Sequence, residues 1–369
     1  MAVCQTWCMT NNAQDQAVLT QVQCSTGIIE LNRPKALNSL NLEMVDAIAA
    51  VLDRWDDDES IHRILIRSTS PKAFCAGGDV RASRDAGLAG HIDEADQFFV
   101  TEYEMNEFIS LMSKPYIAVL DGIVMGGGLG LSLHASHRVV TEKVMAAMPE
   151  MAIGFATDCG ISWESQRIRL ADGGDGTAFA RFIGITGWRL GAADMMFTGW
   201  GTDFVPHDVI EEFQQMLITE SLDEALDKFG ADPADVEGTE PSWLEAHREA
   251  IESCFHHDTW AEMSAAIDAC PDEEFVAKVR ELLVGANPTS VVATAELCAA
   301  THGLPTAREG LDTEMALGNV LRREPNFAEG VRAVLVDKDR DPHFDPSEYA
   351  AVDPQPYREV VRKAAGQQS

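Results

Sequence analysis

Apolar runs of strand length alternate with helical patterns in the first part of the chain. Four short runs predict strands, the first two forming a hairpin: 17–24, 27–31, 62–67 and 116–120. Asn41 is a good N-cap for a helix whose apolar residues recur at helical spacing up to the acidic run at 56–58. A second helical pattern covers 93–112. This alternation of strands and helices predicts an α/β fold.

Helices dominate the rest of the chain, where no convincing strand pattern remains. Amphipathic patterns predict helices at 242–255, 258–269, 272–286, 288–301 and 306–322. The segment 230–241 contains glycine and proline and is the best candidate for a boundary. We therefore expect a core over 17–230 and an α-helical C-terminal region over 231–369.

A glycine-rich turn follows the apolar run at 116–120. Three successive glycines at 126–128 lead into a helix start at Leu129. Glycine lets the backbone approach a ligand closely, and the unpaired N–H groups of a helix start lie in a partly positive field. Such a turn stabilises a phosphate or the oxyanion of an attacked carbonyl. Nucleotide patterns do not fit, because Leu131 stands where a dinucleotide turn needs glycine or alanine and no Gly-Lys-Ser/Thr follows.

A second turn of the same kind lies upstream, at 75–79. It follows the predicted strand at 62–67, and Asp79 is a good N-cap for a helix that begins at Val80. In their order and separation, the two turns resemble those of the crotonase (enoyl-CoA hydratase/isomerase) superfamily. The resemblance implies a spiral of ββα units and an oxyanion hole for an acyl-CoA thioester. Its two N–H donors would be Gly78 and Gly127.

Further contacts to the substrate are implied by the same resemblance. The loop at 32–40 resembles the segment that lies along coenzyme A, so that Arg33, Lys35 and Leu37 are candidate contacts, and Asp79 beside the oxyanion turn is another. Without the resemblance, two basic residues around a proline are equally typical of an exposed loop. Glu102 matches a glutamate that lines the pocket in the acyl-CoA hydrolase branch, although a helical glutamate facing solvent is the alternative.

Two carboxylates are the candidates for the chemistry. Glu150 follows Pro149 in apolar surroundings, which raise the pKa of a carboxyl group and suit it to proton transfer or attack. Asp158 lies on the next predicted loop and helix start, where it is equally typical of an N-cap. Hydratases of the superfamily use two glutamates, and at the first of these places this chain has Gly130. Hydration therefore lacks one carboxylate.

The pattern of carboxylates resembles the 3-hydroxyisobutyryl-CoA hydrolase branch. The tail at 326–339 also resembles that branch, whereas Thr157 and Ile161 replace its usual proline and glycine around the aspartate. The implied reaction is the hydrolysis of 3-hydroxyisobutyryl-CoA to 3-hydroxyisobutyrate and coenzyme A in valine degradation. The alternatives are a hydratase or isomerase of the superfamily and a noncatalytic interaction protein. A serine hydrolase is disfavoured, because Ser132 lies in a predicted helix without a Gly-x-Ser-x-Gly motif.

The charge balance limits the choice of partners. The formal net charge is −32, which argues against nucleic acid and anionic membranes and requires local positive charge wherever coenzyme A binds. Cys254, His256 and His257 have no second pair of ligands nearby, so we expect no metal site. We also expect no separate cofactor, because coenzyme A is part of the substrate. Members of the superfamily associate, so a homo-oligomer is one possibility, and the sequence leaves the oligomeric state open. Because the first 32 residues contain no Lys or Arg, we expect a cytoplasmic protein.

Overall fold

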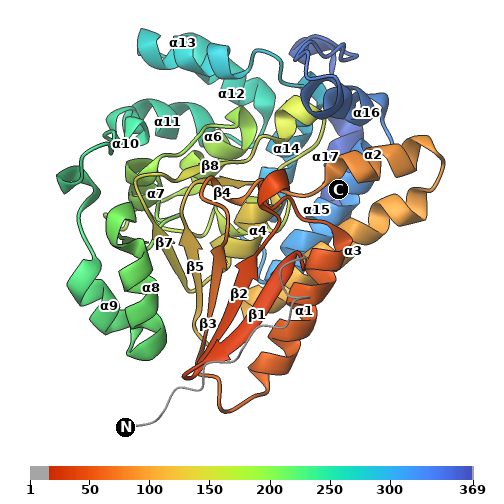
Figure 1. Ribbon diagram of the computed structural model, residues 1–369. Coiled ribbons are helices and arrows are strands. Elements are labelled where there is room, and N and C mark those ends of the chain that lie inside the picture. Colours follow the sequence, from red (N-terminus) through yellow and green to blue (C-terminus); the bar gives the residue numbers. More distant parts are fainter. Residues whose placement is uncertain (1–15, 368–369) are drawn as a thin grey trace.

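A six-stranded sheet forms the first layer of the computed structural model, which describes residues 16–367 (Figure 1). Its strands are β1 (Val18–Gln23), β2 (Thr26–Leu31), β3 (Arg63–Ser68), β5 (Tyr116–Leu120), β7 (His137–Val140) and β9 (Asp203–Phe204), in the order β1-β2-β3-β5-β7-β9. The β1–β2 hairpin is antiparallel, and every other pairing is parallel. The predicted hairpin and the strands at 62–67 and 116–120 are confirmed.

A second, three-stranded parallel sheet carries the turns of interest. It consists of β4 (Ala73–Cys75), β6 (Ile123–Met125) and β8 (Met145–Ala147), in the order β4-β6-β8. The chain passes from a strand of the large sheet to a strand of the small sheet and then into a helix, and it repeats this unit. The ββα spiral implied by the resemblance is therefore confirmed.

Both faces of the central strands of the large sheet are buried, which explains their continuous apolar runs. Leu65, Ile117 and Val119 pack with α8 (Ile210–Thr219) and α9 (Leu222–Phe229) on one face. Their neighbours along the strands, such as Ile66 and Ala118, join the main core on the other face. This period of two is the geometry of a strand, because successive side chains point to opposite faces.

The remaining helices surround the two sheets. They are α1 (Leu42–Asp56), α2 (Val80–Leu88), α3 (Ile92–Leu111), α4 (Gly127–Leu133), α5 (Ile161–Glu164), α6 (Thr177–Thr186), α7 (Ala192–Thr198), α10 (Trp243–Ala246), α11 (Arg248–Phe255), α12 (Trp260–Ala269), α13 (Glu273–Leu282), α14 (Pro288–Thr301), α15 (Ala307–Leu321), α16 (Pro325–Val331) and α17 (Gln355–Ala364). The helical C-terminal region shares the main core with the strands, since Ile66 and Leu317 belong to one cluster. The division at 230 into two domains stays a prediction.

Three details of the helices differ from the sequence pattern. The predicted helix 242–255 is divided at His247, whose backbone leaves helical geometry and whose ring contacts Asp272. Helix α4 begins at Gly127, two positions before the expected helix start at Leu129. The Asp79 side chain does not cap α2, although Asp79 occupies the N-cap position.

No helix among residues 16–367 combines the length and apolarity that crossing a bilayer requires.

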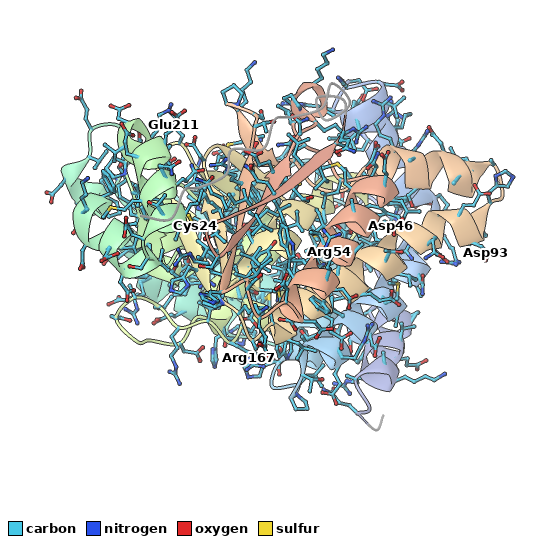
Figure 2. The ribbon with its side chains drawn as sticks, turned by 60° about the horizontal axis from the view of Figure 1, so that its bottom comes forward. Cys24, Asp46, Arg54, Asp93, Arg167 and Glu211 are labelled. Atoms are coloured by element: carbon cyan, nitrogen blue, oxygen red, sulfur yellow. The ribbon has the colours of Figure 1, made fainter. Side chains whose placement is uncertain are left out.

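The acidic residues are distributed over the outside of the molecule. Asp46 on α1, Asp93 on α3 and Glu211 on α8 are exposed, with Glu211 on the opposite side of the molecule from the other two (Figure 2). This distribution is that of a solvated acidic surface. The carboxyl groups that are buried therefore stand out against it.

Candidate active site

The carboxyl ends of the small sheet bring three predicted site residues to one edge. β4 leads to Gly78, β6 leads to Gly127 and β8 leads to Glu150. Because the three strands are parallel neighbours, their carboxyl ends meet at the same edge. The two glycine turns come very close there: a Cβ atom built on Gly77 would lie 3.8 Å from the Cα atom of Gly126. The same Cβ atom would lie 3.2 Å from the Met125 carbonyl oxygen, and the φ of Gly77 is 99°, so this position favours glycine.

Hydrogen bonding leaves the predicted oxyanion donors free. The neighbouring amides are tied down, since Asp79 donates its N–H to the Leu40 carbonyl at 2.7 Å and Gly126 donates to the Ala147 carbonyl at 3.2 Å. For the N–H groups of Gly78 and Gly127, no acceptor is present within residues 16–367. Both glycines line one pocket of about 840 Å³. Two unpaired backbone donors are therefore available to a ligand oxygen in this pocket.

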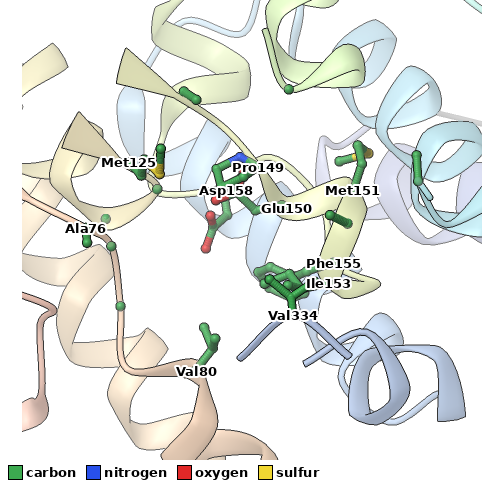
Figure 3. A pocket seen from close by; sticks show the side chains of 18 of the residues that line it. Ala76, Val80, Met125, Pro149, Glu150, Met151, Ile153, Phe155, Asp158 and Val334 are labelled. Atoms are coloured by element: carbon green, nitrogen blue, oxygen red, sulfur yellow. The ribbon is translucent and has the colours of Figure 1, made fainter. Parts of the chain in front are cut away.

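Glu150 lies in the same pocket as the two glycines. It opens the 3₁₀ turn Glu150–Ile153, only 5% of its surface is exposed, and its Oε2 atom has no partner among the described residues. A Cβ atom built on Gly126 would lie 2.9 Å from Glu150 Oε1. Figure 3 shows Glu150 and Asp158 projecting into the pocket from the same side. Glu150 is thus a buried carboxyl group with an open oxygen beside the glycine turns.

Asp158 and Glu102 complete a cluster of three buried carboxyl groups. Tyr103 donates its hydroxyl to Asp158 Oδ2 at 2.8 Å. Asp158 is therefore not an N-cap, because the following helix α5 is capped by Gly160. Glu102 is 2% exposed and lines the pocket, so the alternative of a glutamate facing solvent is excluded.

Burial makes these groups stronger bases than ordinary carboxylates. It raises the pKa of Glu150 well above 4.5, and the charges of Asp158 and Glu102 raise it further. Burial likewise raises the pKa of Asp158 to about 6, although the hydrogen bond from Tyr103 acts in the opposite direction. The pKa of Glu102 is also raised by burial and by Asp158. Raised pKa values mean that these three groups keep their protons at pH values where an exposed carboxyl group has lost its proton.

A cation could be considered at part of this cluster. Ligand-type atoms of Glu102, Asp158 and Cys159 lie within 4.8 Å of one another. Burial and the nearby carboxylates raise the pKa of the Cys159 thiol well above 9.0, and a protonated thiol is a poor metal ligand. The donor set therefore does not fit a metal that needs a thiolate, and the expectation of a metal-free site stays a prediction.

Gly130 occupies a place that has no room for a side chain. A Cβ atom built there would lie 2.7 Å from the Cβ atom of Cys159 and 3.0 Å from Nδ2 of Asn106. Both neighbours are buried, and Gly130 lies inside helix α4. At the position where hydratases of the superfamily carry their first glutamate, the side chains of Cys159 and Asn106 therefore occupy the space that a side chain would need.

The predicted coenzyme A contacts lie outside the lining of this pocket. Arg33 pairs with Asp79 at 3.6 Å and donates to the Ser39 carbonyl. Lys35 is exposed, and Leu37 has a left-handed backbone with φ 51°. The role of these four residues in binding stays a prediction.

Other residues of the pocket gave no local signal in the sequence. Its cations are Arg189, Lys278 and Arg340, two of them from the helical C-terminal region. Tyr103 follows Glu102 directly, so a search for polar neighbours of the candidate glutamate would have found it. The cations could not be found in this way, because folding alone brings them to the pocket.

Comparisons with known proteins agree with this geometry. The family model described as enoyl-CoA hydratase/isomerase matches residues 26–361. A chicken protein named 3-hydroxyisobutyryl-CoA hydrolase, mitochondrial, is 36% identical over 92% of this chain and 86% of its own length. Its human counterpart of the same name is 33% identical over 92% of this chain and 87% of its own length.

Two solved structures share the fold over almost their whole length. One is described as a carnitinyl-CoA dehydratase from Mycobacterium thermoresistibile, with a TM-score of 0.84, 31% identity and coverage of 96% of this chain and 97% of that chain. The other is described as an enoyl-CoA hydratase from Rhodobacter sphaeroides, with a TM-score of 0.81, 31% identity and coverage of 95% and 98%. These descriptions name reactions that differ from that of the curated relatives.

The expectation of a cytoplasmic location is wrong. The curated relatives are named as mitochondrial proteins, and the expectation rested on the composition of the first residues, which carries no information about the folded part that these relatives share. The family model covers both glycine turns, the carboxylates and most of the helical region, and the curated relatives align along nearly the whole chain. The chain therefore belongs to the enoyl-CoA hydratase/isomerase family.

Proposed function

We propose that this chain hydrolyses the thioester of 3-hydroxyisobutyryl-CoA to 3-hydroxyisobutyrate and coenzyme A. One observation carries the proposal: a buried carboxyl group with an unpaired oxygen, Glu150, shares a pocket with the two unpaired amides of Gly78 and Gly127. The hydrolysis of a thioester needs a nucleophile, either a carboxylate or an activated water, and hydrogen-bond donors for the oxyanion. Glu150 and the two glycine amides in this pocket can serve these purposes. The names of the curated relatives support the choice of acyl group.

In the proposed reaction, the thioester carbonyl oxygen accepts hydrogen bonds from Gly78 and Gly127. Attack on the carbonyl carbon moves the electron pair of the C=O bond onto this oxygen. Donors that are already aligned stabilise the new charge without reorganising, and each contributes roughly 3 kcal/mol in the transition state.

Two routes of attack are compatible with Glu150. As a general base, its carboxylate removes a proton from water, and the water oxygen bonds to the carbonyl carbon. As a nucleophile, its own oxygen bonds to that carbon, and water later hydrolyses the mixed anhydride. In both routes the C–S bond breaks and the sulfur leaves with its electron pair, taking up a proton. Label found in Glu150 after a single turnover in ¹⁸O-labelled water would identify the anhydride route, because label enters Glu150 only when water attacks the glutamyl carbonyl of the mixed anhydride.

Asp158 and Glu102 are proposed to act on the acyl group and on water. Asp158 accepts a hydrogen bond from Tyr103 through one oxygen, which leaves its second oxygen for the substrate hydroxyl or the attacking water. Glu102 lies close to the glycine turn at 126–128, since a Cβ atom on Gly127 would collide with Glu102 Oε1.

No separate cofactor takes part in this proposal. Association into a homo-oligomer, proposed on the resemblance alone, is measured by light scattering.

Hydration is the second candidate, because the two solved structures are described as a dehydratase and a hydratase. Against it stands the space around Gly130, where Cys159 and Asn106 fill the place of the first catalytic glutamate. The addition of water to a double bond needs one group to remove a proton from water and another to deliver one. The crowding at Gly130 therefore favours hydrolysis.

The experiment supplies the purified protein with 3-hydroxyisobutyryl-CoA and, separately, with an enoyl-CoA. Free coenzyme A and the acyl product are measured by chromatography, which avoids interference from protein thiols. We expect coenzyme A release from the first substrate and no loss of the enoyl absorbance from the second. The matched control for Glu150→Gln is Glu104→Gln, the same substitution at an exposed position of α3. Hydration without thiol release would refute the proposal.

A further inference from the structure

The turn that carries Asp158 has an unusual backbone. Cys159 has φ 60° and Gly160 has φ 79°, so two successive residues are left-handed. For a residue with a side chain, this conformation costs on the order of 1–3 kcal/mol and persists only where the surroundings hold it. The short helix α5 begins directly afterwards, at Ile161. The direction of the Asp158 side chain therefore depends on what holds this turn.

Glu314 on α15 holds the turn by three hydrogen bonds. Gly160 donates its N–H to Oε2 at 2.6 Å, and Ser162 donates its N–H and its hydroxyl to Oε1 at 2.9 and 2.6 Å. Both oxygens of the carboxyl group are therefore occupied by this one segment. Glu314 is 2% exposed and does not line the pocket, so it has no contact of its own with a ligand there.

The contacts of Glu314 differ from the other ties between this segment and the helical region. Thr301 donates its hydroxyl to the Ser162 carbonyl at 3.0 Å, and Trp163 donates its indole N–H to the Leu304 carbonyl at 2.8 Å. These bonds fix helix α5. Glu314 binds the amide of Gly160 at the end of the left-handed pair, so its hydrogen bonds act on the strained turn itself and not on helix α5 alone.

We infer that Glu314 is a positioning residue, which holds Asp158 in its working orientation by binding the Gly160 and Ser162 amides. The inference rests on the proposed function, in which Asp158 binds the substrate hydroxyl or water. It also gives the helical C-terminal region a part in the reaction, because a carboxylate from that region fixes a turn 154 positions earlier in the chain.

The test replaces Glu314 by Gln. The amide offers one acceptor oxygen, and its NH₂ group meets one of the two backbone donors, so the turn loses at least one bond. With 3-hydroxyisobutyryl-CoA we expect kcat to fall about 10- to 100-fold while KM changes less than about threefold, because misplacing a reacting group affects turnover more than binding. The control is Glu309→Gln in the first turn of the same helix, where the half-buried Glu309 carboxyl group accepts hydrogen bonds from Thr306 and does not contact the turn at 158–162. Its kcat should equal that of the wild type.

A second readout is independent of catalysis. Cys159 is 1% exposed in the turn, so its alkylation by iodoacetamide, followed on the isolated peptide by mass spectrometry, reports whether the turn opens. We expect alkylation at least about tenfold faster in Glu314→Gln than in Glu309→Gln, because freeing the strained turn exposes the thiol. If the wild type releases no coenzyme A, the proposed function fails, whereas unchanged protection of Cys159 overturns the role of Glu314.

Ser162→Ala provides a milder variant in case Glu314→Gln does not fold. It removes only the hydroxyl donor at 2.6 Å and leaves both backbone donors in place. We expect a loss of about three- to tenfold in kcat with unchanged KM, in line with the loss of one hydrogen bond. A folded variant of either kind with wild-type kcat, or with its whole defect in KM, would overturn the inference.

Discussion

Replacing Gly130 by Ala tests the crowding on which the choice of reaction rests. The added Cβ atom would lie 2.7 Å from Cys159 Cβ and 3.0 Å from Asn106 Nδ2, whereas carbon atoms pack at about 3.5–4.0 Å. The neighbours must therefore move by about 1 Å in a region without space. Overpacking of this kind costs about 1–3 kcal/mol, and the better helix propensity of alanine returns at most about 1 kcal/mol. We expect a net destabilisation of about 1–2 kcal/mol.

The assay is a double-mutant cycle with Cys159→Gly, read as the midpoint of thermal or denaturant unfolding. Glycine at 159 removes the colliding Cβ atom and suits the left-handed backbone at φ 60°. The cost of Gly130→Ala should therefore shrink markedly in the Cys159→Gly background, because the two positions are in contact. Gly130→Ala that is as stable as the wild type, or whose cost is the same in both backgrounds, would show that a side chain fits there.

Three further predictions concern the carboxylates. Glu150→Gln should lower kcat by about 10²- to 10⁴-fold, measured as coenzyme A release, and a wild-type rate would contradict the assignment of Glu150. The variant should also be at least as stable as the wild type at pH 8, measured by thermal unfolding. The reason is the raised pKa of Glu150, which means that keeping its ionised form buried costs stability as the pH rises. The acid limb of kcat/KM should lie above pH 4.5, since the base must lose its proton against a raised pKa; a limb in the ordinary carboxyl range counts against a buried base. In Tyr103→Phe, Asp158 loses a hydrogen bond that lowers its pKa, so we expect this pKa to rise above about 6. The titration of the Asp158 carboxyl group is followed by NMR or infrared spectroscopy, and an unchanged pKa would contradict the contact.

Much of the local structure follows from short stretches of sequence. The apolar runs of β3 and β5 and the N-cap Asn41 each depend on a few adjacent residues, and each has the predicted form. The two turns and Glu150 could also be recognised, since each directly follows an apolar strand. The break at His247 could not, because it coincides with a contact to Asp272 that is made only in the folded chain.

The sequence by itself determined the α/β fold, the two glycine turns and the isolated glutamate after Pro149, because hydrophobic period, backbone freedom and residue type act over a few positions. Only the tertiary structure decided that Tyr103 faces Asp158, that Glu314 holds the following turn, and that Lys278 and Arg340 line the pocket while Arg33 pairs with Asp79. These partners lie far apart along the chain. Their pairing depends on how α3, α13 and α15 pack around the small sheet, and no local pattern records that packing.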